Sequence, residues 1–193
     1  MATIRRMCQV IALMLLACAA FESAGSASAQ AAPGPIYVAE AQGTITSVTI
    51  GYLRNALHLA EASNANLLLI EISSPGAVLR DARPFAGEIA AARIPVVVYV
   101  APAGTVSGAA GALFLSAAHL SAMAPSTSFG SPYPLAQVDE ALTQQTRELV
   151  LDSVTDQIRA WNADRGRNVE WVDRAVREGL VLTNEQALSL IHI

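Results

Sequence analysis

Two turns built from small residues carry the groups of this chain that could do chemistry. Residues 73–77 read Ser-Ser-Pro-Gly-Ala, and residues 102–111 are rich in glycine and alanine. Ser107 lies in the second turn near the expected start of a helix, where the helix dipole favours an anion. His119, beyond that helix, is a candidate base for a serine nucleophile. A lone histidine after a helix is more often a surface or capping residue, so both interpretations of His119 stay open.

Other reactive arrangements are missing from the sequence. There is no His-x-x-x-His pair and no carboxylate cluster with metal-ligand spacing, so no metal is expected. The glycine-rich segments lack the lysine of a phosphate-binding loop, so no nucleotide cofactor is expected either. Asp152 and Asp156 are one helical turn apart and are expected on a solvated helix face. His58, between two leucines, is expected to pack or to snorkel.

The charged residues exclude two further classes of function. All 12 positively charged side chains are arginines, so any mechanism that needs a lysine base is excluded from this polypeptide. The net charge is −4 and there is no basic run beyond Arg165 and Arg167, so nucleic acid is not an expected partner. The 53% hydrophobic content with few aromatic residues suits one α/β domain with a small-residue core.

The elements that must position the two turns alternate between strands and helices. The apolar run 67–72 predicts a strand buried on both faces, and the β-branched run 95–100 predicts the clearest strand. Three shorter segments predict further strands: 36–39, 43–45 and 120–123. Apolar residues at helical spacing predict helices over 47–62, 78–92 and 107–117. This alternation predicts right-handed crossovers and a parallel sheet, that is, an α/β fold.

The C-terminal third is predicted to be helical and more charged. Its apolar stripe changes sides near residues 149–151, which predicts either a break in the helix or a change of packing partner there. Asn168 is expected to cap a short helix, after a turn whose two arginines form salt bridges to nearby carboxylates. Thr183 and Gln186 have the spacing of a capping box for a final helix.

The two ends of the chain are expected to lie outside the folded domain, residues 30–187. Residues 1–29 have the pattern of an export signal that ends in Ala-x-Ala, which predicts a domain on the periplasmic or extracytoplasmic face of the membrane. A rival interpretation is a lipobox that attaches lipid to Cys18. Cleavage after residue 29 removes Cys8 and Cys18, so no disulfide is expected. Residues 188–193 back-translate to a transposon-based sequencing adapter, so His192 is expected to be an artefact that re-sequencing would reveal.

The two turns belong to a longer pattern of motifs. It continues with Ala-Met-Ala-Pro at 122–125, Gly130, Arg-Gly-Arg-Asn at 165–168 and Glu-Trp at 170–171. Together these resemble the NfeD-type membrane-bound serine proteases, relatives of the Clp protease within the crotonase-like superfamily. The resemblance implies repeated ββα units with a parallel sheet and C-terminal helices.

The resemblance also implies a catalytic centre, and this chain departs from it. In the family a serine at a helix start attacks the peptide, a lysine on a later helix deprotonates it, and backbone amides hold the oxyanion. The matching positions are Ala109 for the serine and, within a residue or two, Leu149 for the lysine. The second glycine of the oxyanion turn is Ala77, a position where glycine's backbone freedom is expected to matter. The amides of Gly76 and Ala110 are the expected remaining oxyanion donors.

Three hypotheses about function follow. The first is a catalytically inactive, homo-oligomeric family member that binds hydrophobic C-terminal segments of stomatin-like membrane proteins. The second is an active endopeptidase that uses Ser107, with His119 as base. The third is a crotonase relative that binds acyl-CoA through the same paired amides. A fluorophosphonate probe distinguishes the first two, because only an active serine would be labelled.

Overall fold

The computed structural model describes residues 34–130, 143–171, 174 and 178–191 of the 193-residue chain. Residues Pro33–Ile193 form one compact unit. The predicted export signal with Cys8 and Cys18, and also His192, lie outside the described residues. Across the described ranges, no helix combines the length and the apolar character that crossing a membrane requires.

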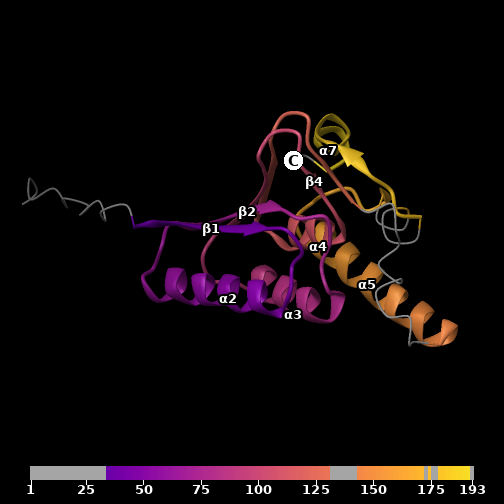
Figure 1. The fold of residues 1–193 in the computed structure, drawn as a ribbon, viewed down its shortest axis with the longest axis horizontal. Coiled ribbons are helices and arrows are strands. Elements are labelled where there is room, and N and C mark those ends of the chain that lie inside the picture. The colour runs from indigo at the N-terminus through magenta and orange to yellow at the C-terminus, as the bar shows by residue number, and fades with distance from the viewer. Residues whose placement is uncertain (1–33, 131–142, 172–173, 175–177, 192–193) are drawn as a thin grey trace, which may run out of the picture. The chain divides into compact units, whose positions relative to one another are not determined.

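A four-stranded parallel sheet is the centre of the fold, as the alternation of elements predicts. Its strands lie in the order β1-β2-β3-β5: β1 (Ile36–Gln42), β2 (Leu67–Ser73), β3 (Val96–Val100) and β5 (Leu120–Met123). The connecting helices are α2 (Ser47–Ala62), α3 (Leu79–Ala90) and α4 (Ala109–Ala117). Figure 1 shows α2 and α3 side by side on one face of the sheet.

The core lies between these helices and one face of the sheet. Alternate strand residues point into it and are fully buried: Ala39, Ala41, Leu68, Ile70, Ile72, Val96, Val98 and Val100. Phe85 of α3 and Phe114 of α4 meet edge to face, with ring centroids 5.6 Å apart. The expectation that β2 is buried on both faces is wrong, because the residues between the buried ones stay half-exposed.

A second, smaller sheet joins the middle of the chain to its C-terminal part. β4 (Val106–Ser107) pairs in parallel with β6 (Ser128–Phe129), which pairs antiparallel with β7 (Leu182–Thr183). The predicted capping box before α7 (Asn184–Ile191) is confirmed. Thr183 N–H donates to Gln186 Oε1 (3.0 Å), and Gln186 N–H donates to Thr183 Oγ1 (3.3 Å).

Helix α5 (Gln144–Asp164) is continuous through residues 149–151, so of the two predicted alternatives the break is wrong. Its second half packs on the core through Val154, Ile158 and Trp161, which are buried. In the first half, Val150 and Leu151 are only partly buried against the core, and Leu149 is 65% exposed. The apolar stripe therefore changes sides where the helix leaves the core, and this change needs no interruption of the helix.

Two boundaries differ from the sequence-based expectation. Gly43, at φ +73°, ends β1, so the strand predicted over 43–45 is reduced to an isolated bridge between Ile45 and Ala77. Ser107 was expected in the following helix but belongs to β4, because Gly108 is the extended N-cap of α4.

Candidate functional site

The two small-residue turns meet where β2 ends and α4 begins. Gly108 N–H donates a 2.6 Å hydrogen bond to the backbone oxygen of Ser74. A Cβ at position 108 would collide with the carbonyl group of Pro75, so the approach requires glycine. We call residues 74–77 and 108–110 the joined turns.

The buried side chain of Ser74 holds the turn at residues 74–77 through hydrogen bonds to its backbone. It is fully buried, its Oγ donates to the oxygen of Gly76 (2.7 Å), and it accepts from Gly76 N–H (3.3 Å). Ile45 N–H also donates to the oxygen of Gly76 (3.0 Å), and Val78 N–H donates to Ile45 O (3.2 Å). The Gly76 amide, predicted as an oxyanion donor, is therefore already engaged by Ser74.

In the turn at residues 74–77, the backbone N–H of Ala77 is the donor that the bridge to Ile45 leaves unused. In its parallel bridge with Ile45, the bonds are made by the flanking Gly76 oxygen and Val78 amide, so Ala77 N–H points the other way. Among the described non-glycine residues, positive φ angles occur at Asn64 and Ser126 and not at Ala77. In this chain the backbone at Ala77 therefore does not adopt the positive φ that favours glycine.

The start of α4 supplies a second donor. N–H groups in the first turn of a helix have no partner within the helix, and the dipole there favours negative charge. Ala109 is the first residue of α4 and Ala110 the second. The amides of Ala77 and Ala110 thus lie on the two turns that the Gly108–Ser74 bond joins, a pairing that suits a peptide carbonyl oxygen.

Ser107 does not face the joined turns. It is fully buried, and its Oγ has no hydrogen-bond partner. A Cβ at Gly111 would contact this Oγ, so the hydroxyl lies under the first turn of α4. A buried hydroxyl in this position is not accessible to a substrate.

His119 lies beyond the opposite end of α4 from Ser107. The nine residues of α4 span about 14 Å at the α-helical rise, so the structure does not bring the two side chains together. His119 Nδ1 accepts from Val96 N–H (3.2 Å), which requires an unprotonated nitrogen. Burial, with help from Arg165 and Arg167, lowers the pKa of His119 below its usual value. His119 is thus a capping residue of the sheet, the second of the two interpretations.

Arg167 is a structural residue of the site whose role the sequence did not predict. Its guanidinium donates to the oxygens of Leu115 (2.8 Å) and Ala118 (3.1 Å) at the C-terminal end of α4. Burial, with help from Arg165, lowers the pKa of Arg167 to about 10. Among the described residues, Arg167 makes these carbonyl contacts and no salt bridge to Glu170, while Asp173, the other predicted partner, lies outside the described residues. The contacts hold α4 through a residue far along the chain.

The remaining candidates lie elsewhere. Asp152 and Asp156 are exposed, as predicted, and Asp156 pairs with Arg159 (3.7 Å). Asn168 Oδ1 accepts from Glu170 N–H (2.7 Å), as a helix cap would, while the helix predicted after it lies largely outside the described residues. Across the described ranges, no group of three metal-ligating side chains is present.

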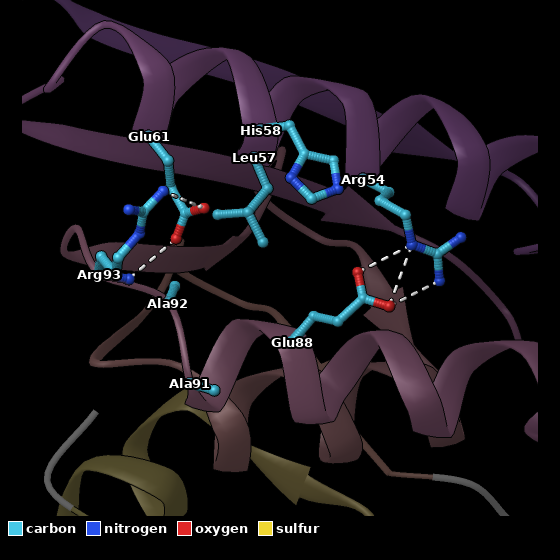
Figure 2. Close-up of a pocket in the computed structure, with 8 residues that line it drawn as sticks. All are labelled: Arg54, Leu57, His58, Glu61, Glu88, Ala91, Ala92 and Arg93. Atoms are coloured by element: carbon cyan, nitrogen blue, oxygen red, sulfur yellow. Dashed lines mark hydrogen bonds and ion pairs between the residues drawn. The ribbon is translucent and has the colours of Figure 1, made fainter.

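His58 lines a pocket of about 480 Å³ between α2 and the end of α3 (Figure 2). The charged groups that flank it are paired within the chain. Arg54 and Glu88 form an ion pair at 2.8 Å, and Arg93 and Glu61 form one at 3.5 Å. The exposed His58 is consistent with a side chain that snorkels along an otherwise apolar helix.

One curated protein and several solved structures are similar to this chain, while no family model matches it. The membrane-bound protease PH1510 of Pyrococcus horikoshii is 31% identical over 159 residues, which cover 79% of this chain and 35% of that protein. The chain thus spans about a third of the length of this relative.

The solved structures cover more of their own length. A serine-to-alanine mutant of the 1510-N membrane-bound stomatin-specific protease aligns with a TM-score of 0.73 at 30% identity, over 84% of this chain and 79% of that one. A lysine-to-alanine mutant of the same protease, in complex with a substrate peptide, has a TM-score of 0.72 at 29% identity and covers 84% and 74%.

More distant structures share the fold alone. The catalytic domain of the Plasmodium falciparum ClpP protease has a TM-score of 0.62 at 11% identity, over 79% of each chain. The predicted ClpP-type α/β fold is thereby confirmed. With the identity and coverage of the nearer matches, these findings show that the chain belongs to the NfeD-type, ClpP-like family of membrane-bound proteases.

Proposed function

We propose that this chain binds an extended apolar peptide at the joined turns without cleaving it. The expected peptide is a hydrophobic C-terminal segment of a stomatin-like membrane protein, since the related protease is stomatin-specific. The observation that carries the proposal is the 2.6 Å hydrogen bond from Gly108 N–H to Ser74 O, which joins the two turns in a chain that has no lysine.

The loss of cleavage rests on the positions of the reacting groups. The resemblance implies that residues 96–125 align with the family pattern without gaps, and the proposal takes Ala109 as the nucleophile position on that basis. The lysine position falls at or near Leu149, and no lysine exists to occupy a neighbouring position. Losing one member of such a catalytic set typically lowers the rate by a factor of about 10⁴ or more.

Peptide binding is separable from cleavage in the related protease. Its lysine-to-alanine mutant forms a complex with a substrate peptide, so a missing lysine is compatible with an occupied site there. In this chain the amides of Ala77 and Ala110 supply the donors for a peptide carbonyl, and neither depends on a reacting side chain. An endopeptidase that uses Ser107 is disfavoured, because that hydroxyl is buried.

Restoring the missing residues tests the first half of the proposal. Ala109→Ser is combined with a lysine placed in turn at each of residues 148–151, and each variant is assayed on a fluorogenic apolar peptide. We expect cleavage from one of these variants and none from the wild-type chain. Ala109→Ser alone is the matched control, because it supplies the nucleophile without the base. Wild-type labelling by a fluorophosphonate would contradict the loss of activity.

Direct binding tests the second half. A fluorescein-labelled apolar C-terminal peptide is titrated with the wild-type chain, and its anisotropy gives the Kd. We expect saturable binding that is weakened by Gly108→Ala, which separates the joined turns, and unchanged by Val48→Ala on the exposed face of α2. If neither the wild-type chain nor a restored variant binds the peptide, the proposed function is wrong.

Export and self-association belong to the same proposal. The expected export signal puts the domain on the extracytoplasmic face of the membrane, with Cys18 as the alternative lipid attachment site. Fractionation of cells that express the wild-type chain and Cys18→Ser distinguishes the two, since only lipidation depends on this thiol. Sedimentation of the purified domain tests the expected homo-oligomer.

A further inference from the structure

The parallel sheet has one face that no described element covers. Helices α2, α3 and α4 pack on the other face, and Figure 1 shows no described element over the opposite side of β1. All-parallel sheets are almost always covered on both faces, because their strands are apolar on both. An uncovered parallel face is therefore a candidate binding surface.

The strand register shows how apolar residues line this face. Val38, Leu69, Val97 and Leu120 are paired across all four strands, and Ile36 and Leu67 form the row before them. Ile36 is 61% exposed, Val38 56% and Leu120 61%. We call these six residues the apolar rows. Leu67, Leu69 and Val97, which lie between them, are partly exposed. Together the six form a continuous apolar surface of the kind that marks a binding site.

Two carboxylates follow the apolar rows on the same face. Glu40 and Glu71 are directly paired across β1 and β2, two residues beyond Val38 and Leu69. Like charges directly opposite each other in a sheet destabilise it. Glu40 accepts a hydrogen bond from Gln42 Nε2 (3.3 Å), but among the described residues no cation forms an ion pair with either carboxylate. The described part of the chain therefore gives this face neither an apolar cover nor a positive charge.

We infer that the uncovered face binds a partner helix that carries two apolar residues and one lysine or arginine at successive helical turns. Rows two residues apart on a strand are about 6.6 Å apart, and residues i and i+4 of a helix are about 6 Å apart along its axis. Apolar residues at i and i+4 thus match the apolar rows, and a cation at i+8 matches Glu40 and Glu71. The inference does not depend on the proposed peptide site.

The charges favour this occupant over two others. An anionic lipid surface is repelled by the paired carboxylates. A second copy that docks the same face with its strands parallel brings four carboxylates together, and like charges across an interface are unfavourable. A helix with a basic residue satisfies the carboxylates and covers the apolar rows together.

Charge reversal tests the inference with stapled helical peptides of about four turns. One peptide carries leucine at two positions one turn apart and lysine one turn further, and the other carries glutamate in place of the lysine. By fluorescence anisotropy we expect the wild-type chain to bind the lysine peptide about tenfold more tightly than the glutamate peptide, a typical gain for one charged contact. Glu40→Lys with Glu71→Lys is expected to reverse this preference.

A pair of matched variants separates the face from the rest of the surface. Val38→Glu is expected to abolish binding of the lysine peptide, while Val48→Glu, on the exposed side of α2, leaves it unchanged. Circular dichroism at the same temperature confirms that both variants are folded. Equal affinity for both peptides, or no binding by the wild-type chain, would overturn the inference. So would a wild-type dimer that Val38→Glu converts to a monomer, since the face would then belong to a second copy.

Discussion

Gly108 is the residue on which the geometry of the joined turns depends most directly. Because a Cβ there would collide with the Pro75 carbonyl group, Gly108→Ala forces the two turns apart. We expect the free energy of unfolding to fall by about 1–3 kcal/mol, the usual range for overpacking. Urea denaturation of the wild-type chain and the variant measures the difference.

Gly76 offers a matched control in the adjoining turn. A Cβ at this position meets nothing within 4 Å, and its φ is not positive. Gly76→Ala should therefore change the free energy of unfolding by less than about 0.5 kcal/mol, as surface substitutions usually do. Equal losses at both glycines would mean that the close approach at Gly108 is not what constrains the turn.

Ser107 is buried without a hydrogen-bond partner, so its hydroxyl is expected to lower the free energy of unfolding. Ser107→Ala is expected to leave the free energy of unfolding unchanged or to raise it by up to about 1 kcal/mol. Ser121→Ala is the control, because the Ser121 hydroxyl donates to Leu115 O (2.7 Å), and its loss is expected to cost about 1 kcal/mol. A clear loss of stability in Ser107→Ala would contradict the buried, unpartnered hydroxyl.

For single residues, the sequence predicted where the backbone turns but not the direction in which side chains point. Proline, glycine and small residues at 73–77 and 102–111 predicted two turns, and the structure joins them. The direction of Ser107 could not be predicted, because it depends on the pairing of β4 with β6, which lies more than twenty residues further along the chain. The engaged amide of Gly76 likewise depends on a single serine rotamer.

Among the helices, α4 depends on a contact from outside its own segment. Arg167→Met removes the guanidinium that satisfies the carbonyl oxygens at the C-terminal end of α4. The expected loss is about 2 kcal/mol, for charge-assisted hydrogen bonds and a favourable helix-dipole interaction. Arg174→Met is the control, since its exposed ion pair with Glu178 should contribute less than about 1 kcal/mol. Chemical denaturation of both variants measures the losses, and equal losses would contradict the role of Arg167.

The contact of His119 with β3 gives the fold a pH dependence. The pKa of His119 is lower in the folded chain than in the unfolded one, so the unfolded chain binds more protons near that pKa. Its contribution to stability is fully present above the unfolded pKa, about 6.5, and is lost as the pH falls through the folded pKa. We expect the midpoint of urea unfolding to decrease on acidification from pH 7.5 to 5.5, and to decrease less in His119→Gln. The same slope in both proteins would contradict this role.

Helix and strand positions were predicted well wherever one pattern dominated. The apolar spacing over 47–62 and the capping box at Thr183 and Gln186 both appear in the structure as predicted. Of the two alternatives for residues 149–151, the break was wrong and the change of packing fits, because an apolar stripe indicates which side of a helix is buried and not whether the helix continues. The contact of Arg167 with α4 is long-range, so no local pattern could predict it.

At the scale of the whole molecule, the sheet has one buried and one accessible face, and the two should respond differently to the same substitution. Val98→Thr places a hydroxyl in the fully buried core and is expected to cost about 1–3 kcal/mol. Val38→Thr, on the accessible face, should change the free energy of unfolding by less than about 0.5 kcal/mol. Both residues are β-branched, so strand propensity is matched. Similar losses in thermal or urea unfolding would show that the second face is covered within the chain.

The parallel sheet itself could be predicted from the sequence, and its uncovered face could not. Continuous apolar runs such as residues 67–72 predicted strands covered on both sides. The described elements cover only one face, because a run of this kind indicates that both faces avoid water and does not indicate what covers them. A cover supplied by another molecule leaves the same pattern as one supplied by the chain.

The bond between Gly108 and Ser74 has a consequence for how this family can change over evolutionary time. It is made by two backbone groups, so the shape of the site is inherited independently of the residues that react. A lineage can therefore exchange its nucleophile and its base without unfolding the pocket, and two codons would be enough to return them. Replacement of Gly108 would be different, because it would remove the shape that both peptide binding and any restored cleavage require.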